Sequence, residues 1–105
     1  MGFSMLSFAQ DSFEVVERVI DGDTVVLEGG ERIRLLYINT PERGEEGFEE
    51  AKQYMIDRIE KKTVQIRRTG KGYYGRTLGV LYYHGCNIND ELLNNGMAKT
   101  YCYKC

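Results

Sequence analysis

The sequence predicts a mainly β domain with two or three helices, of the α+β class. The expected fold is a five-stranded Greek-key barrel of the OB type with a helix inserted after the third strand. Three observations lead to it. Apolar and polar residues alternate over the first part of the chain, between turns that contain Gly. From Phe48 the apolar residues recur every three or four positions, which is typical of a helix. Alternation then returns for two further strands.

Three strands come first. Residues 14–20 and 24–27 are rich in β-branched side chains, and the Asp-Gly-Asp at 21–23 between them is a hairpin turn signal. The third strand covers residues 31–38, where apolar and polar side chains again alternate. We expect this strand to carry the side chain of Arg34 outward.

The inserted helix begins at Phe48. Glutamates at its start and lysines at its end suit the helix dipole. Its apolar face is formed by Phe48, Ala51, Met55 and Ile59. Two strands follow, at residues 63–69 and 75–83, and the second of them turns back at residues 84–85.

A short second helix closes the domain. Asn87 or Asn89 is expected to cap it, and Gly96 is expected to end it. Residues 97–103 form a last extended segment. We therefore assign residues 12–105 to one domain, and residues 1–11 to a segment outside the fold that is either the end of a secretory signal or a tail.

Composition excludes several classes of protein. The formal net charge of −2 argues against a domain that coats duplex DNA by charge alone. The charge is nevertheless uneven, because seven of the fourteen basic residues lie within residues 58–76, whereas five glutamates lie within residues 42–50. No apolar run approaches the eighteen residues that a membrane-spanning helix needs.

Residues 34–42 bring different chemical groups close together in the chain. Arg34 offers a planar set of donors for phosphate, and Glu42 offers a carboxylate that can hold or deprotonate water. Asn39 and the carbonyl of Thr40 are hard oxygen ligands. Asp23, at the end of the neighbouring strand, is expected to meet Asn39, which completes a set of oxygens suited to calcium rather than zinc.

The order and spacing of several motifs resemble those of the staphylococcal-nuclease-like, or thermonuclease, family from about Val15 to Lys104. The matching segments are Val-Ile-Asp-Gly-Asp-Thr-Val at 19–25, Arg-Leu-Leu at 34–36, Thr-Pro-Glu at 40–42, Tyr-Gly-Arg at 74–76, Asn-Asp-Glu-Leu-Leu at 89–93, Gly-Met-Ala-Lys at 96–99 and Tyr101. The resemblance implies a calcium-dependent phosphodiesterase that acts on DNA and RNA. It implies cleavage on the 5′-oxygen side that leaves 3′-phosphate ends.

The resemblance also implies a role for each matching residue. Asp23 and the carbonyl of Thr40 match calcium ligands, and Asp21 matches a supporting carboxylate. Glu42 matches the residue that orients or deprotonates the attacking water. The two arginines that match a phosphate grip are Arg34 and Arg76.

Two tyrosines, and an asparagine where family members have aspartate, complete the expected site. Tyr74 and Tyr101 fall near family positions that touch the substrate, and aromatic rings also stack single-stranded bases. We expect the remaining candidates, Tyr73, Tyr82, Tyr83 and Tyr103, to be packed in the structure. Asn39 stands where the best-known members have Asp, so we expect weak calcium binding, in about the millimolar range.

An alternative reading is a non-catalytic nucleic-acid-binding barrel. Retention of Glu42 favours the enzyme, since its negative charge would only repel phosphates in a binder. A structural domain that binds a protein partner is supported by nothing beyond the fold. We expect a monomer, secreted or at the cell surface, that prefers single-stranded DNA and RNA and does not bind membranes.

The three cysteines leave alternatives open. A disulfide from Cys86 to Cys102 or Cys105 would tie the end of the chain to the barrel, whereas a Cys102–Cys105 bond closes a loop too small to stabilise much. A zinc site that also uses His84 is the less favoured hypothesis, because His84 and Cys86 lie at a hairpin.

Overall fold

The computed structural model describes residues 10–102 and confirms the predicted barrel. Five strands form it: β1 (Gln10–Asp21), β2 (Thr24–Leu27), β3 (Arg32–Leu35), β5 (Thr63–Lys71) and β6 (Thr77–Tyr83). They lie in the order β3-β2-β1-β5-β6. All neighbours in this order are antiparallel, and a parallel pairing of β3 with β6 closes the barrel.

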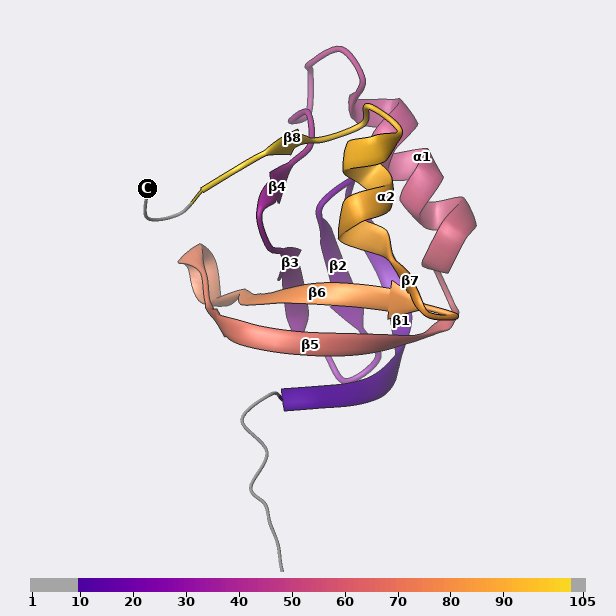
Figure 1. The fold of residues 1–105 in the computed structure, drawn as a ribbon, viewed down its shortest axis with the longest axis vertical. Coiled ribbons are helices and arrows are strands. Elements are labelled where there is room, and N and C mark those ends of the chain that lie inside the picture. The colour runs from indigo at the N-terminus through magenta and orange to yellow at the C-terminus, as the bar shows by residue number, and fades with distance from the viewer. Residues whose placement is uncertain (1–9, 103–105) are drawn as a thin grey trace, which may run out of the picture.

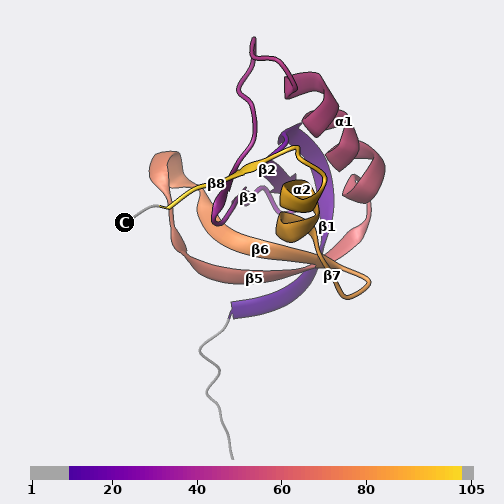
Figure 2. The same ribbon diagram turned by 45° about the horizontal axis from the view of Figure 1, so that its top comes forward.

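The remaining elements lie at the edges of the barrel (Figures 1 and 2). They are β4 (Ile38–Asn39), α1 (Phe48–Ile59), the 3-10 helix η1 (Tyr73–Gly75), β7 (Cys86–Asn87), α2 (Ile88–Asn94) and β8 (Lys99–Thr100). β4 and β8 pair with each other in a separate two-stranded sheet. The helix inserted after the early strands is therefore α1, as predicted. No helix in the described part of the chain is both long and apolar enough to span a membrane.

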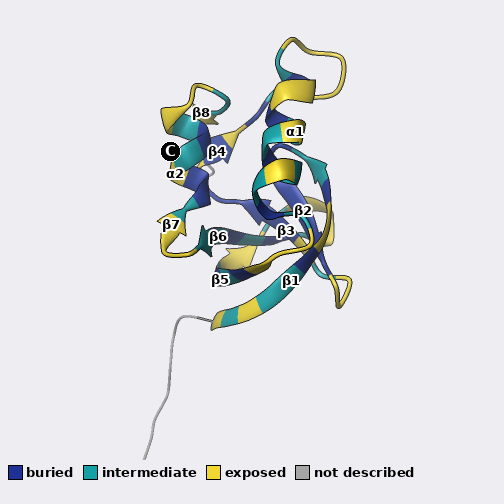
Figure 3. Cartoon of the chain, turned by 90° about the vertical axis from the view of Figure 1, so that its right-hand side faces the viewer, coloured by how far each residue is buried: buried dark blue, intermediate teal, exposed yellow. Residues whose placement is uncertain are grey.

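The core lies inside the barrel and under the two helices. β2 is buried along its whole length (Figure 3). The helix buries the four side chains that its spacing predicted, namely Phe48, Ala51, Met55 and Ile59. The alternating strands add further buried side chains, and the largest of these are Leu27, Ile33, Leu35, Ile66 and Leu81. The periodicities of two and of three to four thus identify the residues that form the core.

The first strand starts earlier than predicted. β1 begins at Gln10, so Gln10 and Asp11 pair with β5 instead of lying outside the fold. Asp11 faces Arg67 across the ladder and forms an ion pair with it at 3.1 Å. This cross-strand pair extends the strand past the point where apolar alternation ends. Residues 1–9 lie outside the described residues.

The predicted strand at 31–38 is wrong in its second half. β3 ends at Leu35, and the chain turns at Leu36 and Tyr37 before β4 begins. Leu36 donates its amide to the carbonyl of Gly79 at 2.8 Å, and Tyr37 adopts a left-handed backbone with φ 70°. The turn also buries Arg34, whose side chain was predicted to point outward.

The second helix is capped by Asn87, one of the two predicted candidates. Its side chain accepts the amide of Asp90 at 2.9 Å. Asn89 is instead buried and joins three segments: it donates to the carbonyl of Leu36 at 2.9 Å, and its amide oxygen accepts the backbone N–H of Leu81 at 3.2 Å. A buried amide of this kind ties the β3–β4 turn to β6 and α2.

The predicted staple from Cys86 is wrong. The thiol of Cys86 is free and exposed on β7, whereas Cys102 is disulfide-bonded. Cys86 follows the His84-Gly85 turn of the β6–β7 hairpin, where both residues have positive φ. This hairpin leaves the thiol facing solvent.

A polar cluster joins the two helices. Glu91 of α2 accepts a bidentate pair of hydrogen bonds from Arg58 of α1 at 2.8 and 2.9 Å, and a third from the hydroxyl of Tyr54 at 2.6 Å. The guanidinium of Arg58 lies over the ring of Tyr83, 5.2 Å from its centroid. The hydrogen bonds from Arg58 hold the pKa of Glu91 below its ordinary value.

Replacing Glu91 should weaken the helix contact in a pH-dependent way. We expect Glu91→Gln to lower the free energy of unfolding at pH 7 by roughly 1 to 2 kcal/mol, since the bonds are charge-assisted but partly exposed. A folded-state pKa below the ordinary value of 4.5 means that this stabilisation is present above that pH and is lost as pH falls through the lowered pKa. Urea unfolding between pH 7 and pH 3 checks this.

The matched control is Glu17→Gln, which neutralises an exposed carboxylate on β1. Its unfolding free energy should follow that of the wild type at every pH. A constant gap between Glu91→Gln and wild type down to pH 3 would contradict the assignment.

Candidate functional site

One cavity of about 580 Å³ brings together every residue that the sequence analysis selected. It is lined by Asp21, Asp23, Arg34, Asn39, Thr40, Glu42, Tyr74, Arg76 and Tyr101. These residues come from the β1–β2 turn, the end of β3, the segment around β4, the η1 turn and the segment after β8. Residues more than 70 positions apart in the chain thus share one concave surface. Their individual roles remain predictions.

Asp23 is held in place from two sides. Its Oδ2 accepts both the backbone N–H of Thr40 at 2.9 Å and the Thr40 hydroxyl at 3.1 Å. Its Oδ1 accepts the hydroxyl of Thr24 at 3.2 Å. Asp23 and Thr40 are both buried, so these bonds form where water does not compete. They join the β1–β2 turn to the segment after β4.

The guanidinium of Arg34 explains why the chain turns after β3. Its Nη1 donates to the carbonyls of Leu35 at 2.7 Å and Ile38 at 2.9 Å. Its Nη2 donates to Oδ1 of Asn39 at 3.0 Å and lies 3.5 Å from Oδ2 of Asp23. The buried guanidinium is planar and rigid, so its hydrogen bonds fix the conformation of the turn. The carboxylate of Asp23 compensates its charge.

The pKa of Asp21 is raised by its surroundings in the cavity. Burial and the nearby carboxylate of Asp23 raise the pKa of Asp21 to about 6. Asp21 also accepts the backbone N–H of Asp23 at 3.0 Å, which positions the two carboxylates at the same turn. The β1–β2 turn thus places two carboxylates in one part of the cavity.

The oxygen donors of the cavity fit a hard divalent cation. Asp21 and Asp23 supply carboxylates, Asn39 an amide oxygen and Thr40 a carbonyl, and none of the described residues that line the cavity is a cysteine or a histidine. Within residues 10–102 no three His, Cys, Asp or Glu side chains form a group that could hold a metal. A cation would thus depend on two carboxylates and on neutral oxygens. The two neighbouring carboxylates of the β1–β2 turn favour its binding.

Glu42 lies in a turn closed by Glu45, a residue that the sequence analysis did not select. The backbone N–H of Glu42 donates to Oε1 of Glu45 at 2.6 Å, and the backbone N–H of Glu45 donates to the carbonyl of Glu42 at 2.8 Å. The carboxylate of Glu42 stays exposed at the cavity. The spacing of three residues, as in a capping box, is the signal that identifies such a pair.

Arg76 is positioned by the η1 turn. Its Nε donates to the carbonyl of Tyr73 at 3.0 Å, and its guanidinium lies 5.6 Å from the centroid of the Tyr74 ring. Tyr74 adopts a left-handed backbone and is 92% exposed. Tyr73 was predicted to be packed, but it is exposed and lines the cavity.

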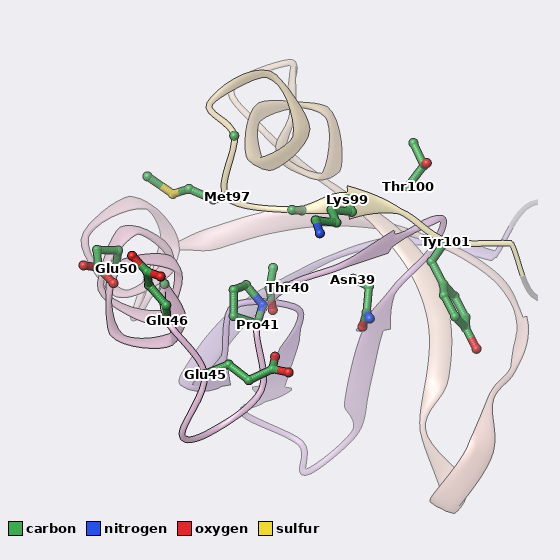
Figure 4. A pocket seen from close by; sticks show the side chains of 13 residues that line it. Asn39, Thr40, Pro41, Glu45, Glu46, Glu50, Met97, Lys99, Thr100 and Tyr101 are labelled. Atoms are coloured by element: carbon green, nitrogen blue, oxygen red, sulfur yellow. The ribbon is translucent and has the colours of Figure 1, made fainter.

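A second cavity of about 860 Å³ adjoins the first. It shares four lining residues with the first: Asn39, Thr40, Pro41 and Tyr101. Figure 4 shows the carboxylates of Glu46 and Glu50 at one end and Tyr101 at the other. Glu45, Glu46 and Glu50 thus line this second cavity, whereas Arg34 and Arg76 line the first.

The sequence is similar to those of several known proteins. A model of the family described as "Staphylococcal nuclease homologue" matches residues 32–105. An uncharacterized endonuclease from Haemophilus influenzae is 37% identical over 90 residues, which cover 82% of this chain and 51% of the relative. The micrococcal nuclease of Shigella flexneri is 38% identical over 112 residues, with 95% and 64% coverage.

A more distant relative shows a similar extent of match. The thermonuclease of Staphylococcus hyicus is 27% identical over 112 residues, covering 94% of this chain and 65% of that protein. The chain therefore spans about half to two thirds of the length of these curated relatives.

The glycine at the β1–β2 turn should be essential for the contact between Asp23 and Thr40. A Cβ at Gly22 would lie 2.8 Å from both the Ala51 Cβ and the Thr40 Oγ1, so Gly22→Ala must displace Thr40 or the start of α1. We expect a loss of roughly 1 to 3 kcal/mol in unfolding free energy, measured by urea denaturation. Gly29→Ala is the control, because its Cβ meets nothing within 4 Å. Equal losses in both variants would contradict the steric explanation.

Proposed function

The chain belongs to the staphylococcal nuclease homologue family, and on this premise we propose that it is a nuclease that hydrolyses phosphodiester bonds of DNA and RNA. The observation that supports the proposal most strongly is that Arg34, Arg76 and Glu42 line one cavity together with a set of oxygen donors. Two guanidiniums match the charge of a phosphate, and the carboxylate matches the need for a base. Relatives named endonuclease, micrococcal nuclease and thermonuclease support the same class of reaction.

The proposed cofactor is Ca²⁺. Asp23, Asn39 and the carbonyl of Thr40 would hold it, with Asp21 in support. When bound, the cation supplies positive charge beside the phosphate that is attacked. Its binding would also favour the ionised form of Asp21, whose pKa is raised by burial and by the nearby carboxylate of Asp23.

The protein residues divide the chemistry among them. Glu42 orients a water molecule and accepts its proton as the water oxygen attacks phosphorus. Arg34 and Arg76 stabilise the negative charge that grows on the phosphate oxygens in the transition state. The bond from phosphorus to the 5′-oxygen breaks, and this oxygen takes up a proton from solvent, which leaves a 3′-phosphate on one product and a 5′-hydroxyl on the other.

The surroundings of the cavity favour a single-stranded substrate. Tyr73 and Tyr74 are exposed beside Arg76, and exposed aromatic rings stack bases without regard to sequence. The glutamates of the second cavity would repel a phosphate backbone on that side. A strand that crosses the site therefore approaches over the η1 turn.

Four samples test the proposal directly: the wild type in calcium, the wild type in chelator, and two variants. Denatured DNA should be degraded by the protein in calcium, but not after chelation of the metal. Glu42→Gln should lower kcat by roughly 10²- to 10⁴-fold, because the base is lost while the fold is kept. Arg76→Ala should lower it by about 10²- to 10³-fold, as expected for a group that stabilises the transition state.

Glu49→Gln removes an exposed carboxylate of α1 that does not line the cavity, and its activity should equal that of the wild type. Degradation that continues in chelator, or in Glu42→Gln, contradicts the mechanism. Binding of denatured DNA without any degradation favours the non-catalytic barrel instead.

A third carboxylate should tighten calcium binding. Wild-type affinity is expected in about the millimolar range, and Asn39→Asp should strengthen it by about tenfold or more, since affinity rises with the charge of the ligands. Asn94→Asp adds the same charge on an exposed position of α2 and should leave the affinity unchanged. Calorimetric titration measures all three proteins. Equal affinities for wild type and Asn39→Asp would place the cation elsewhere.

A further inference from the structure

Tyr37 occupies a backbone conformation that costs folding free energy. Its φ of 70° lies in the left-handed region, where a bulky side chain is disfavoured and glycine is not. The side chain is also 62% exposed, so burial in the core returns little of that cost. Stability therefore does not explain a tyrosine at this position. Such strain is typical of residues kept for function.

The turn that contains Tyr37 adjoins the proposed active site. The carbonyl of Tyr37 accepts the backbone N–H of Tyr101 at 2.7 Å, and Tyr101 lines the cavity. Figures 1 and 2 both show the β3–β4 turn, the η1 turn and the segment after β8 on the same side of the molecule. The turn that carries Tyr37 thus lies on the same side of the molecule as the η1 turn, which carries Tyr73 and Tyr74, and all three residues are exposed.

Tyr37 and Tyr74 share an unusual combination of features. Each is an exposed aromatic residue at a turn with positive φ, and each lies beside a residue or segment of the cavity wall. An exposed ring held on a closed turn loses little conformational freedom when a base stacks on it. The main-chain bond to Tyr101 holds the turn of Tyr37 in this way.

We propose that Tyr37 is a stacking position for a nucleobase at least one nucleotide away from the phosphate that is cleaved. The proposal rests on the proposed nuclease function and adds a subsite to it. The ligand is the base of a single-stranded DNA or RNA, because a base in a duplex has no free face to stack on. Substrates longer than a dinucleotide would gain affinity from this contact.

Tyr37→Gly and Tyr37→Phe separate stacking from strain. With a single-stranded oligothymidylate of eight nucleotides, Tyr37→Gly should raise KM by about tenfold and leave kcat near that of wild type. With thymidylyl dinucleotide both constants should be unchanged. Tyr37→Phe keeps the ring, so it should restore the wild-type KM. Urea unfolding should show Tyr37→Gly to be at least as stable as wild type, because glycine relieves the left-handed strain.

Phe13→Ala is the control for loss of an exposed aromatic ring, since Phe13 lies on β1 and does not line the cavity. It should leave KM unchanged. Unchanged KM in Tyr37→Gly, or a fall in kcat together with lower stability, would overturn the subsite while the nuclease function stands. If the wild type degrades nothing, fluorescence anisotropy with the same oligothymidylate decides. A Kd that rises about tenfold in Tyr37→Gly supports the subsite, and an equal Kd overturns it.

Discussion

The buried ion pair of Asp23 and Arg34 is the contact on which the rest of the site depends. Neither charge can leave water at acceptable cost without the other and without hydrogen bonds to satisfy the remaining donors and acceptors. Thr40 provides two of those bonds to Asp23, and the carbonyls of Leu35 and Ile38 receive the guanidinium. One network thus fixes three chain segments relative to each other before a substrate arrives. Pre-organisation of this kind is what catalysis of phosphoryl transfer requires.

Much of the fold was predictable because its signals are local. The spacing of Phe48, Ala51, Met55 and Ile59 identifies both α1 and its buried face, and alternation identifies the barrel strands. The break after Leu35 was not predictable. The turn there, in which Tyr37 is left-handed although local preference would place glycine, is held by the guanidinium of Arg34 and by a hydrogen bond from Leu36 to Gly79, 43 positions later. These contacts override the alternating pattern.

The sequence identified residues that line the candidate cavity, but not their burial and hydrogen bonding, and their roles remain predictions. The spacing of Asp23, Asn39 and Arg76 selects the residues that line the cavity, because these positions fall at strand ends that the barrel brings together. The burial of Arg34 and the support of Glu42 by Glu45 were missed. Both depend on where the chain turns, and an alternating pattern of side chains contains no information on that point.

The pairing of β4 with β8 has a consequence for how the protein is made. Asn39 faces Lys99 in this ladder. Next to the ladder, the backbone N–H of Tyr101 donates a hydrogen bond to the carbonyl of Tyr37. A ribosome delivers the chain from its N-terminus, so this wall of the cavity has no partner strand until the last part of the barrel domain has been synthesised. Nascent chains would therefore lack a complete cavity. For a protein proposed to degrade nucleic acids, this order of assembly delays activity until translation of the domain is nearly finished.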